Sequence, residues 1–245
     1  MYAGEDKQLG FILPGSKGME GIWEFHEGVM VWIVLIVIVV MWVMYRIIGE
    51  NKETRRRIEE GKLKHGDILE VVWTIIPGII LVLIVYPSFK LLYLLDEVVN
   101  PGMTIKVIGN QWYWTYEYSD YENIEGGNIQ IDSYMVPTED LSVGGLRLLE
   151  VDTKLVIPRN AYVRFIVTSS DVIHSWAIPG LGVKIDAYPG RLNQTKIIAE
   201  KAGIYYGQCS EICGANHAFM PIAIEVGTMK DYYLYIDTLI KENNE

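Results

Sequence analysis

The sequence predicts an α+β membrane protein, in which an N-terminal two-helix transmembrane hairpin precedes an antiparallel β-barrel or sandwich. Two segments within the first 95 residues are long and apolar enough to cross a bilayer. From Asn100 onward, short runs rich in β-branched residues are separated by Gly and Pro pairs. Residues 96–245 contain 20 acidic and 11 basic residues. This excess disfavours nucleic acid as a partner and favours basic proteins.

The N-terminal third should contain a strap and two membrane helices. Residues 1–28 lack the basic start, apolar run and cleavage site of a signal peptide. We expect them to form a polar strap. Apolar spans at about 29–48 and 68–95 form the predicted hairpin, residues 29–95. Pro77 should kink the second helix, which membrane helices tolerate. The alternative, two helices in a soluble core, conflicts with a chain too small to bury both all round.

The connection between the spans, residues 49–67, is rich in basic side chains. The positive-inside rule places such a loop on the matrix or cytoplasmic side. The C-terminal domain, residues 96–245, should then lie on the opposite side, in the intermembrane space or periplasm. The basic residues are Lys52, Arg55, Arg56, Arg57, Lys62 and Lys64.

The C-terminal domain should consist mainly of strands. Alternating or apolar runs predict strands near residues 104–108, 111–118, 146–151, 162–168 and 221–226. Residues 229–241 could form an amphipathic helix.

Twelve residues near the C-terminus combine two thiols, an imidazole and a thioether, which are ligands that suit copper. A mononuclear blue-copper site would need one Cys, His217 and Met220 on a loop and a second histidine from an earlier strand. His174, which lies 35 residues upstream of Cys209, could supply that histidine. The second cysteine, Cys213, changes this prediction, because two thiolates can bridge two ions. Each ion then takes one imidazole, and Met220 becomes a weak axial ligand to one of them.

Other interpretations of these residues remain open. The two cysteines, Cys209 and Cys213, could form a disulfide in an oxidising compartment. Two Cys and two His could bind structural zinc. His174 alone would be an ordinary structural histidine. The five side chains together are much more specific than any one of them.

Several motifs resemble those of the cytochrome c oxidase subunit II family over roughly residues 20–228. The most specific, Gln208–Met220, is similar to the dinuclear copper (CuA) motif of that family. The resemblance extends to Asp171–Trp176, Pro189–Gln194, Gln111–Trp114 and Glu70–Pro77. It implies that the C-terminal domain is cupredoxin-like.

The resemblance also implies a set of site residues. Glu211 would bind copper through its backbone carbonyl and reach, through its side chain, a magnesium ion shared with the large subunit. Trp112 would be the point where the electron enters, whereas Trp114 is better interpreted as core. Glu70 would mark the mouth of a proton channel, although an interfacial anchor is the simpler interpretation. The implied copper ligands are His174, Cys209, Glu211, Cys213, His217 and Met220, and the implied docking acids are Glu117, Asp120, Glu122, Asp152 and Asp171.

The function implied is to accept electrons from reduced cytochrome c and pass them to haem in the large catalytic subunit. Oxygen would be reduced to water there, coupled to proton pumping, because this chain has no axial histidine pair in a membrane helix. Further oxidase subunits and the lipid bilayer would be its other partners. The expected location is the mitochondrial inner membrane, with a bacterial plasma membrane as the alternative.

Three rival functions remain. A quinol oxidase subunit would lack the copper ligands. A nitrous-oxide-reductase-like protein would need a second large domain and no hairpin. A membrane-anchored zinc domain would be colourless, whereas a thiolate-bridged copper pair absorbs visible light.

Overall fold

The computed structural model describes residues 2–5, 7–53, 66–97, 100–121 and 129–244. The chain divides into two compact units, one formed by Met1–Trp23 with Tyr93–Glu245 and the other by Glu24–Leu92. Most of the predicted basic loop lies outside the described residues, including Arg55, Arg56, Arg57, Lys62 and Lys64.

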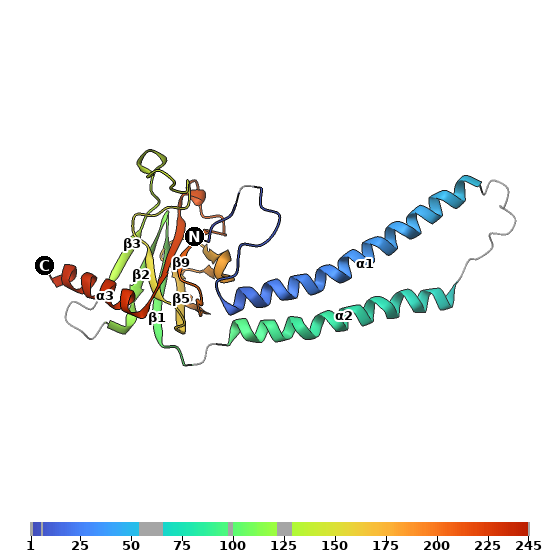
Figure 1. The fold of residues 1–245 in the computed structure, drawn as a ribbon, viewed down its shortest axis with the longest axis horizontal. Helices are drawn as coiled ribbons and strands as arrows, with labels where there is room; N and C mark the ends of the chain where they lie inside the picture. The colour runs from blue at the N-terminus through green and yellow to red at the C-terminus, as the bar shows by residue number, and fades with distance from the viewer. Residues whose placement is uncertain (1, 6, 54–65, 98–99, 122–128, 245) are drawn as a thin grey trace. The chain divides into compact units, whose positions relative to one another are not determined.

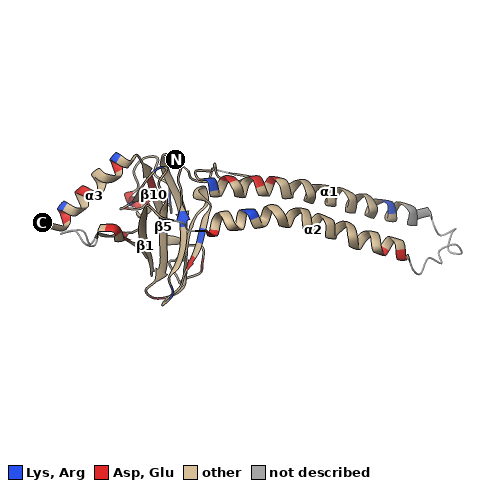
Figure 2. Ribbon diagram, turned by 90° about the horizontal axis from the view of Figure 1, so that it is seen from below, with Lys and Arg blue, Asp and Glu red and all other residues tan. Residues whose placement is uncertain are grey.

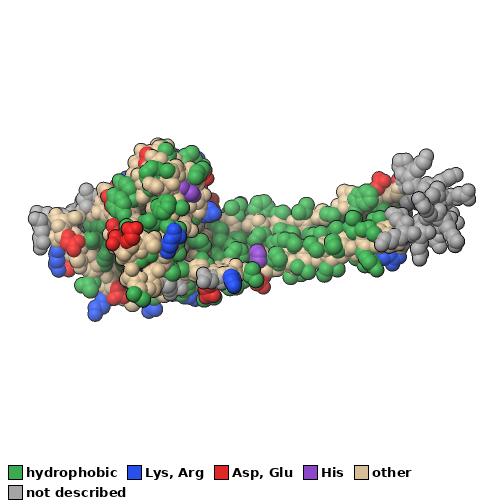
Figure 3. Space-filling model, turned by 90° about the horizontal axis from the view of Figure 1, so that it is seen from above, with side chains coloured by type: hydrophobic (Ala, Val, Ile, Leu, Met, Phe, Trp, Pro, Cys, Tyr) green, Lys and Arg blue, Asp and Glu red, His purple; other side chains and the backbone are tan. Residues whose placement is uncertain are grey.

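Two long helices, α1 (Lys17–Glu53) and α2 (Asp67–Asp96), contain both predicted spans. Each is long and apolar enough to cross a membrane, with a mean hydropathy of 2.7 in its most apolar window. Residues 28–45 and 71–89 contain no charged side chain, and Figure 2 shows charges only toward the described helix ends. Hydrophobic side chains cover the visible face of both helices (Figure 3). Since these apolar faces are unburied, the hairpin requires a lipid environment.

Helix α1 begins earlier than the apolar span, because Ser16 caps it. The Ser16 hydroxyl accepts a hydrogen bond from the Met19 N–H at 3.1 Å, as N-terminal capping serines do. The same hydroxyl donates to the Leu181 carbonyl at 2.7 Å. The start of α1 is therefore attached to the β-rich unit.

The β-rich unit is a sandwich of mixed sheets (Figure 1). The largest sheet has the order β3-β2-β1-β5-β8, the second β4-β10-β9, and the third pairs β6 with β7. The strand bounds are β1 Met103–Asn110, β2 Tyr113–Tyr118, β3 Gln130–Ser133, β4 Leu155–Pro158, β5 Val163–Ser169, β6 His174–Ile178, β7 Val183–Ala187, β8 Asn193–Ile197, β9 Gly203–Gln208 and β10 Pro221–Gly227.

Two features of this sandwich differ from the sequence prediction. The sheets are not purely antiparallel, because β1 pairs in parallel with β5 and β4 in parallel with β10. The predicted strand at residues 146–151 is wrong: this segment forms turns, and Leu148 has a φ of 65°. Its leucines are apolar but not β-branched, so the run lacks the residue types that favour an extended backbone.

The core lies between the sheets, with Val107, Trp114, Phe165, Leu155 and Ile224 fully or almost fully buried. The predicted C-terminal helix is confirmed as α3 (Met229–Asn244). It packs Tyr232 and Ile236 into the same core.

The N-terminal strap covers the edge of β9. Tyr2 stacks on Tyr205 with ring centroids 4.1 Å apart, and the Tyr2 N–H donates to the Ile204 carbonyl at 2.8 Å. Gly15 lies so close to the Tyr205 ring that a Cβ there would come within 2.2 Å of a ring carbon. The strap is therefore fitted to this strand, whose outer edge would otherwise be unpaired.

Candidate metal centre

Two segments bring the predicted ligands together. His174 is the first residue of β6. The remaining ligands lie on the loop between β9 and β10, which begins at Cys209 and ends at Met220. This loop contains one 3₁₀ turn, His217–Phe219.

The sulfur and nitrogen atoms of this cluster converge on one small volume. The two Sγ atoms of Cys209 and Cys213 are 3.9 Å apart. From Cys213 Sγ, both Met220 Sδ and His217 Nδ1 lie at 3.5 Å. Potential ligand atoms of His174, Cys209 and Cys213 lie within 4.8 Å of one another. Both cysteines are free, so the alternative of a disulfide does not describe this structure.

The Glu211 backbone carbonyl also faces the cluster. It accepts a hydrogen bond from Cys209 Sγ at 3.3 Å. The residue itself is exposed, and its side chain extends from the outer surface of the loop. The carbonyl and carboxylate of Glu211 can therefore serve different ligands.

One atom of the cluster indicates a missing partner. His174 is fully buried, and its Nε2 lies 2.8 Å from Asp171 Oδ1. Its Nδ1 is also buried but has no hydrogen-bond partner among the described residues. A buried ring nitrogen without a partner is unfavourable, whereas a neutral imidazole held by a carboxylate is the usual arrangement of a metal-binding histidine. The donor set therefore fits a soft metal such as copper.

The two thiols differ in acidity. Burial opposes ionisation of Cys209, but interactions with His174 and with the backbone at Ser175 and Glu211 lower its pKa to about 7. Burial and the neighbouring Cys209 raise the pKa of Cys213 to about 12. Two thiolates side by side thus repel each other unless a cation lies between them.

Asp171 and His174 stabilise each other. Burial would lower the pKa of His174, but Cys209 and Asp171 raise it. Burial would raise the pKa of Asp171, but hydrogen bonds from His174, Val172 and Gln111 lower it. The Asp171 carboxylate also accepts the Gln111 N–H at 2.7 Å, so it connects His174 to the β1–β2 turn.

Comparisons with known proteins identify the family of the chain. A family model described as cytochrome c oxidase subunit II, periplasmic domain, matches residues 103–227, and one described as its transmembrane domain matches residues 4–91. A cytochrome c oxidase subunit 2 from Mycosarcoma maydis is 51% identical over 231 residues, which cover 94% of this chain and 91% of that protein. The chain belongs to the cytochrome c oxidase subunit II family.

Other relatives extend the match across kingdoms and to a solved structure. Cytochrome c oxidase subunit 2 from Arabidopsis thaliana is 50% identical, covering 99% of this chain and 94% of its own length. The crystal structure of the periplasmic domain of subunit II (CoxB) from Bradyrhizobium japonicum aligns with a TM-score of 0.54 and 47% identity, covering 60% of this chain and 99% of that one. The chain is therefore a membrane-bound subunit of an oxidoreductase complex, with its C-terminal domain outside the bilayer.

Trp112 lies directly against the cysteine loop. It occupies the turn between β1 and β2 and is partly buried. Its Nε1 donates to the Cys213 carbonyl at 3.3 Å, and Gln111 Nε2 donates to the same oxygen at 2.7 Å. Gly214, with a φ of 121°, allows this approach, because a Cβ there would lie 3.1 Å from the indole.

The predicted docking acids fall at two ends of the β1–β2 hairpin. Asp152 lies near the Trp112 end: it accepts the Tyr134 N–H at 2.8 Å, and the Tyr134 ring stacks on Tyr113. Asp171 lies at the same end, as described above. Asp120 accepts the Thr104 N–H at 2.9 Å, at the opposite end.

The other acidic residues predicted from the resemblance lie in different environments. Glu117 forms an ion pair with Lys106 at 2.8 Å, directly across from it in β1. Glu122 lies outside the described residues. Glu70 lies in the first turn of α2, within the membrane unit.

Sequence reasoning missed the importance of Gly109 and left Trp114 as an ordinary core residue. These two residues face each other in the β1–β2 register. A glycine inside an alternating strand is a signal of close backbone approach, but nothing in the sequence identified what approaches it.

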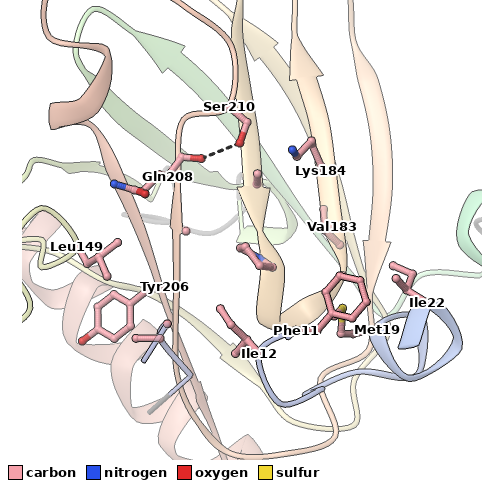
Figure 4. A pocket seen from close by; sticks show the side chains of 16 residues that line it. Phe11, Ile12, Met19, Ile22, Leu149, Val183, Lys184, Tyr206, Gln208 and Ser210 are labelled. Carbon is pink, nitrogen blue, oxygen red and sulfur yellow. Dashed lines mark hydrogen bonds between the residues drawn. The ribbon is translucent and has the colours of Figure 1, made fainter. Parts of the chain in front are cut away.

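A cavity of about 590 Å³ lies beside the cysteine loop (Figure 4). Apolar side chains of the strap and of α1 form one wall, including Phe11, Ile12 and Met19. The opposite wall carries Gln208 and Ser210, the two neighbours of Cys209.

Proposed function

We propose that this chain accepts single electrons from reduced cytochrome c at a dinuclear copper centre and passes them to haem in the large catalytic subunit. There they support oxygen reduction to water coupled to proton pumping. The observation that carries the proposal is the gathering of two free thiols, two imidazoles and a thioether in one small volume around Cys213 Sγ. The buried Nδ1 of His174 has no hydrogen-bond partner among the described residues. Family membership supports the same conclusion.

The ligands would be the six residues predicted from the sequence. Two copper ions bound there would supply a one-electron acceptor in which the unpaired electron is shared. Sheet pairing holds β6 and the two strands that flank the ligand loop, β9 and β10, so the fold itself places the donor atoms. The buried ligands exclude water on the core side, and small reorganisation favours fast electron transfer. The ligands are His174, Cys209, Glu211 (carbonyl), Cys213, His217 and Met220.

Trp112 is the proposed point where the electron enters. A single hydrogen bond joins its indole to the Cys213 carbonyl, so a donor docked over the ring has a short path to a ligand. Exposed apolar side chains on the same loop, Ile212 and Phe219, offer the contact surface for cytochrome c. Asp152 and Asp171 add negative charge at this end, which would steer a basic partner.

The opposite side of the loop is the proposed route to the large subunit. The apolar cavity next to Gln208 and Ser210 would receive an apolar segment of that subunit. The exposed Glu211 carboxylate would hold magnesium at the shared boundary, since Mg²⁺ prefers carboxylate oxygens. Glu70, near the inner end of α2, would mark the mouth of a proton channel, and the membrane would be the mitochondrial inner membrane, with the C-terminal domain in the intermembrane space.

Metal analysis and electron paramagnetic resonance of the purified oxidase test the proposal. We expect two copper ions in this subunit and a spectrum of a delocalised pair. A single copper with a four-line mononuclear spectrum, or zinc in place of copper in this subunit, would refute it.

A further inference from the structure

The pair formed by Gly109 in β1 and Trp114 in β2 contacts both segments that carry predicted ligands. The two residues face each other across the antiparallel β1–β2 pairing. Trp114 is fully buried. Neither residue offers an atom that would bind metal, and family resemblance gave neither a role.

Gly109 makes room for the His174 ring. A Cβ at position 109 would lie 2.8 Å from His174 Cδ2 and 3.0 Å from Cγ, closer than real side chains approach. The Gly109 carbonyl also accepts the Ser170 N–H at 3.1 Å, which fixes the segment leading to Asp171 and His174. Any side chain here would displace the imidazole.

Trp114 contacts both ligand segments. Its ring meets the His174 ring edge-on, with centroids 5.9 Å apart, an arrangement that aromatic pairs prefer. Its Nε1 donates to the Met220 carbonyl at 3.2 Å. This hydrogen bond holds the backbone of the residue whose Sδ lies 3.5 Å from Cys213 Sγ.

We propose that Gly109 and Trp114 are positioning residues of the copper centre: Gly109 sets the place of the His174 imidazole, and Trp114 sets the place of the Met220 thioether. The inference rests on the proposed function. Because a weak axial ligand tunes the potential of a copper site more than it holds the metal, losing the Trp114 N–H should change the potential and not the copper content.

The chain offers a matched control in Trp176. It is also fully buried in the same core, but its Nε1 points to the Tyr116 hydroxyl at 3.4 Å. Trp176→Phe thus removes the same volume and the same N–H without touching the Met220 carbonyl. A general packing defect would affect both variants alike.

The experiment uses the assembled oxidase with Trp114→Phe, Trp176→Phe, Met220→Leu and the Trp114→Phe/Met220→Leu double variant. Copper content, the paramagnetic spectrum and a redox titration are measured for each. We expect Trp114→Phe to keep two coppers but change the redox equilibrium constant at least threefold relative to Trp176→Phe, about 30 mV for one electron. In the Met220→Leu background, Trp114→Phe should no longer shift the potential, because Trp114 and Met220 act as one unit. Gly109→Ala should lose copper or lose the hyperfine signal of one imidazole.

Each outcome decides the matter. Equal shifts in Trp114→Phe and Trp176→Phe, or shifts that add in the double variant, would overturn the role of Trp114. An unchanged spectrum and full copper in Gly109→Ala would overturn that of Gly109. Failure of the unsubstituted oxidase to hold two coppers would instead refute the proposed function.

Discussion

At the scale of single residues, the two thiols of one loop have opposite tendencies. Cys209 ionises readily because His174 and backbone donors stabilise its thiolate, whereas Cys213 resists ionisation beside it. A bound cation removes this conflict, since it compensates both charges at once. The paired thiols of this loop therefore favour a bound cation.

A serine at position 213 should abolish the copper pair. Its hydroxyl does not replace a bridging thiolate, so Cys213→Ser should lose the native spectrum. Met220→Leu should retain two coppers and shift the potential, since the thioether is a weak ligand. Metal analysis and redox titration compare the two variants. Equal copper loss in both would show that the assigned hierarchy of ligands is wrong.

Much of this set of residues was predictable from the sequence, and the reason is chemical. Cys, His and Met have few roles in common other than soft-metal binding, so Cys209 to Met220 stood out without any structure. Gly109 and Trp114 did not, because their contribution depends on a cross-strand register and on which ring lies above a glycine. The hydrogen bond between Trp112 and Cys213 joins residues 101 positions apart, and the sequence alone does not specify such a contact.

At the scale of elements, the period of the hydrophobic pattern and the residue composition decided which segments were predicted correctly. Helices α1 and α2 followed from long apolar runs, β1 and β2 from alternation, and β5 and β10 from runs rich in β-branched and apolar residues. The segment 146–151 contains three leucines and only one β-branched residue, Val151, and it forms turns instead of a strand. Strands β3, β4 and β6 to β8 have only four or five residues, too few for a clear period, so they depend on their neighbours in the sheets.

The C-terminal helix has a reciprocal cap that yields a prediction. Thr228 N–H and Oγ1 both donate to Asp231 Oδ2, at 2.9 and 2.6 Å, and the Asp231 N–H donates back to Thr228 Oγ1 at 3.3 Å. Thr228→Ala should therefore lower the unfolding free energy of the β-rich unit by about 1 kcal/mol, with the copper spectrum unchanged. Thermal unfolding monitored by circular dichroism measures this.

The same cap has a pH dependence. Hydrogen bonds from Thr228 lower the pKa of Asp231 below 3.8. A carboxyl whose pKa is lowered on folding stabilises the protein above its unfolded pKa and loses this effect as the pH falls through the folded value. The difference between Thr228→Ala and the unsubstituted chain should thus shrink below about pH 4. A difference that stays constant down to pH 2 would contradict the cap.

At the scale of the whole molecule, charge is distributed unevenly relative to the proposed docking surface. Asp152 and Asp171 lie at the Trp112 end of the β1–β2 hairpin. Asp120 lies at the other end, roughly 20 Å along the strands at ~3.3 Å per residue. That distance exceeds the screening length of about 8 Å at physiological salt.

Position should therefore decide which carboxylates steer cytochrome c. Asp152→Asn should slow association about twofold at low salt and flatten its salt dependence, whereas Asp120→Asn should have a smaller effect. Stopped-flow reduction of the copper centre at several ionic strengths measures both. Trp112→Phe should leave association intact and slow transfer within the complex. Identical effects of the two Asp variants would argue for long-range steering by net charge alone.

The membrane unit carries a separate prediction. Glu70→Gln should slow steady-state turnover of the assembled oxidase while leaving reduction of the copper centre unchanged, because a glutamine cannot release a proton. Asp67→Asn is the matched control, since Asp67 lies in the same first turn of α2. Equal turnover in both variants and the unsubstituted enzyme would favour an interfacial anchor at position 70.

The strap has a consequence for biogenesis. Tyr2 is synthesised long before Tyr205, yet the two rings stack, and the Tyr2 backbone exchanges hydrogen bonds with Ile204 and Tyr206 on either side of Tyr205. Two predicted membrane spans separate them in the chain, so the strap and β9 must both reach the same side of the bilayer before they can pair. Closure over such a sequence separation is slow, and until it occurs the edge of β9 is exposed to pairing with other chains. Export of the first residues is thus required to cover the edge of β9, which lies about 200 residues later in the sequence.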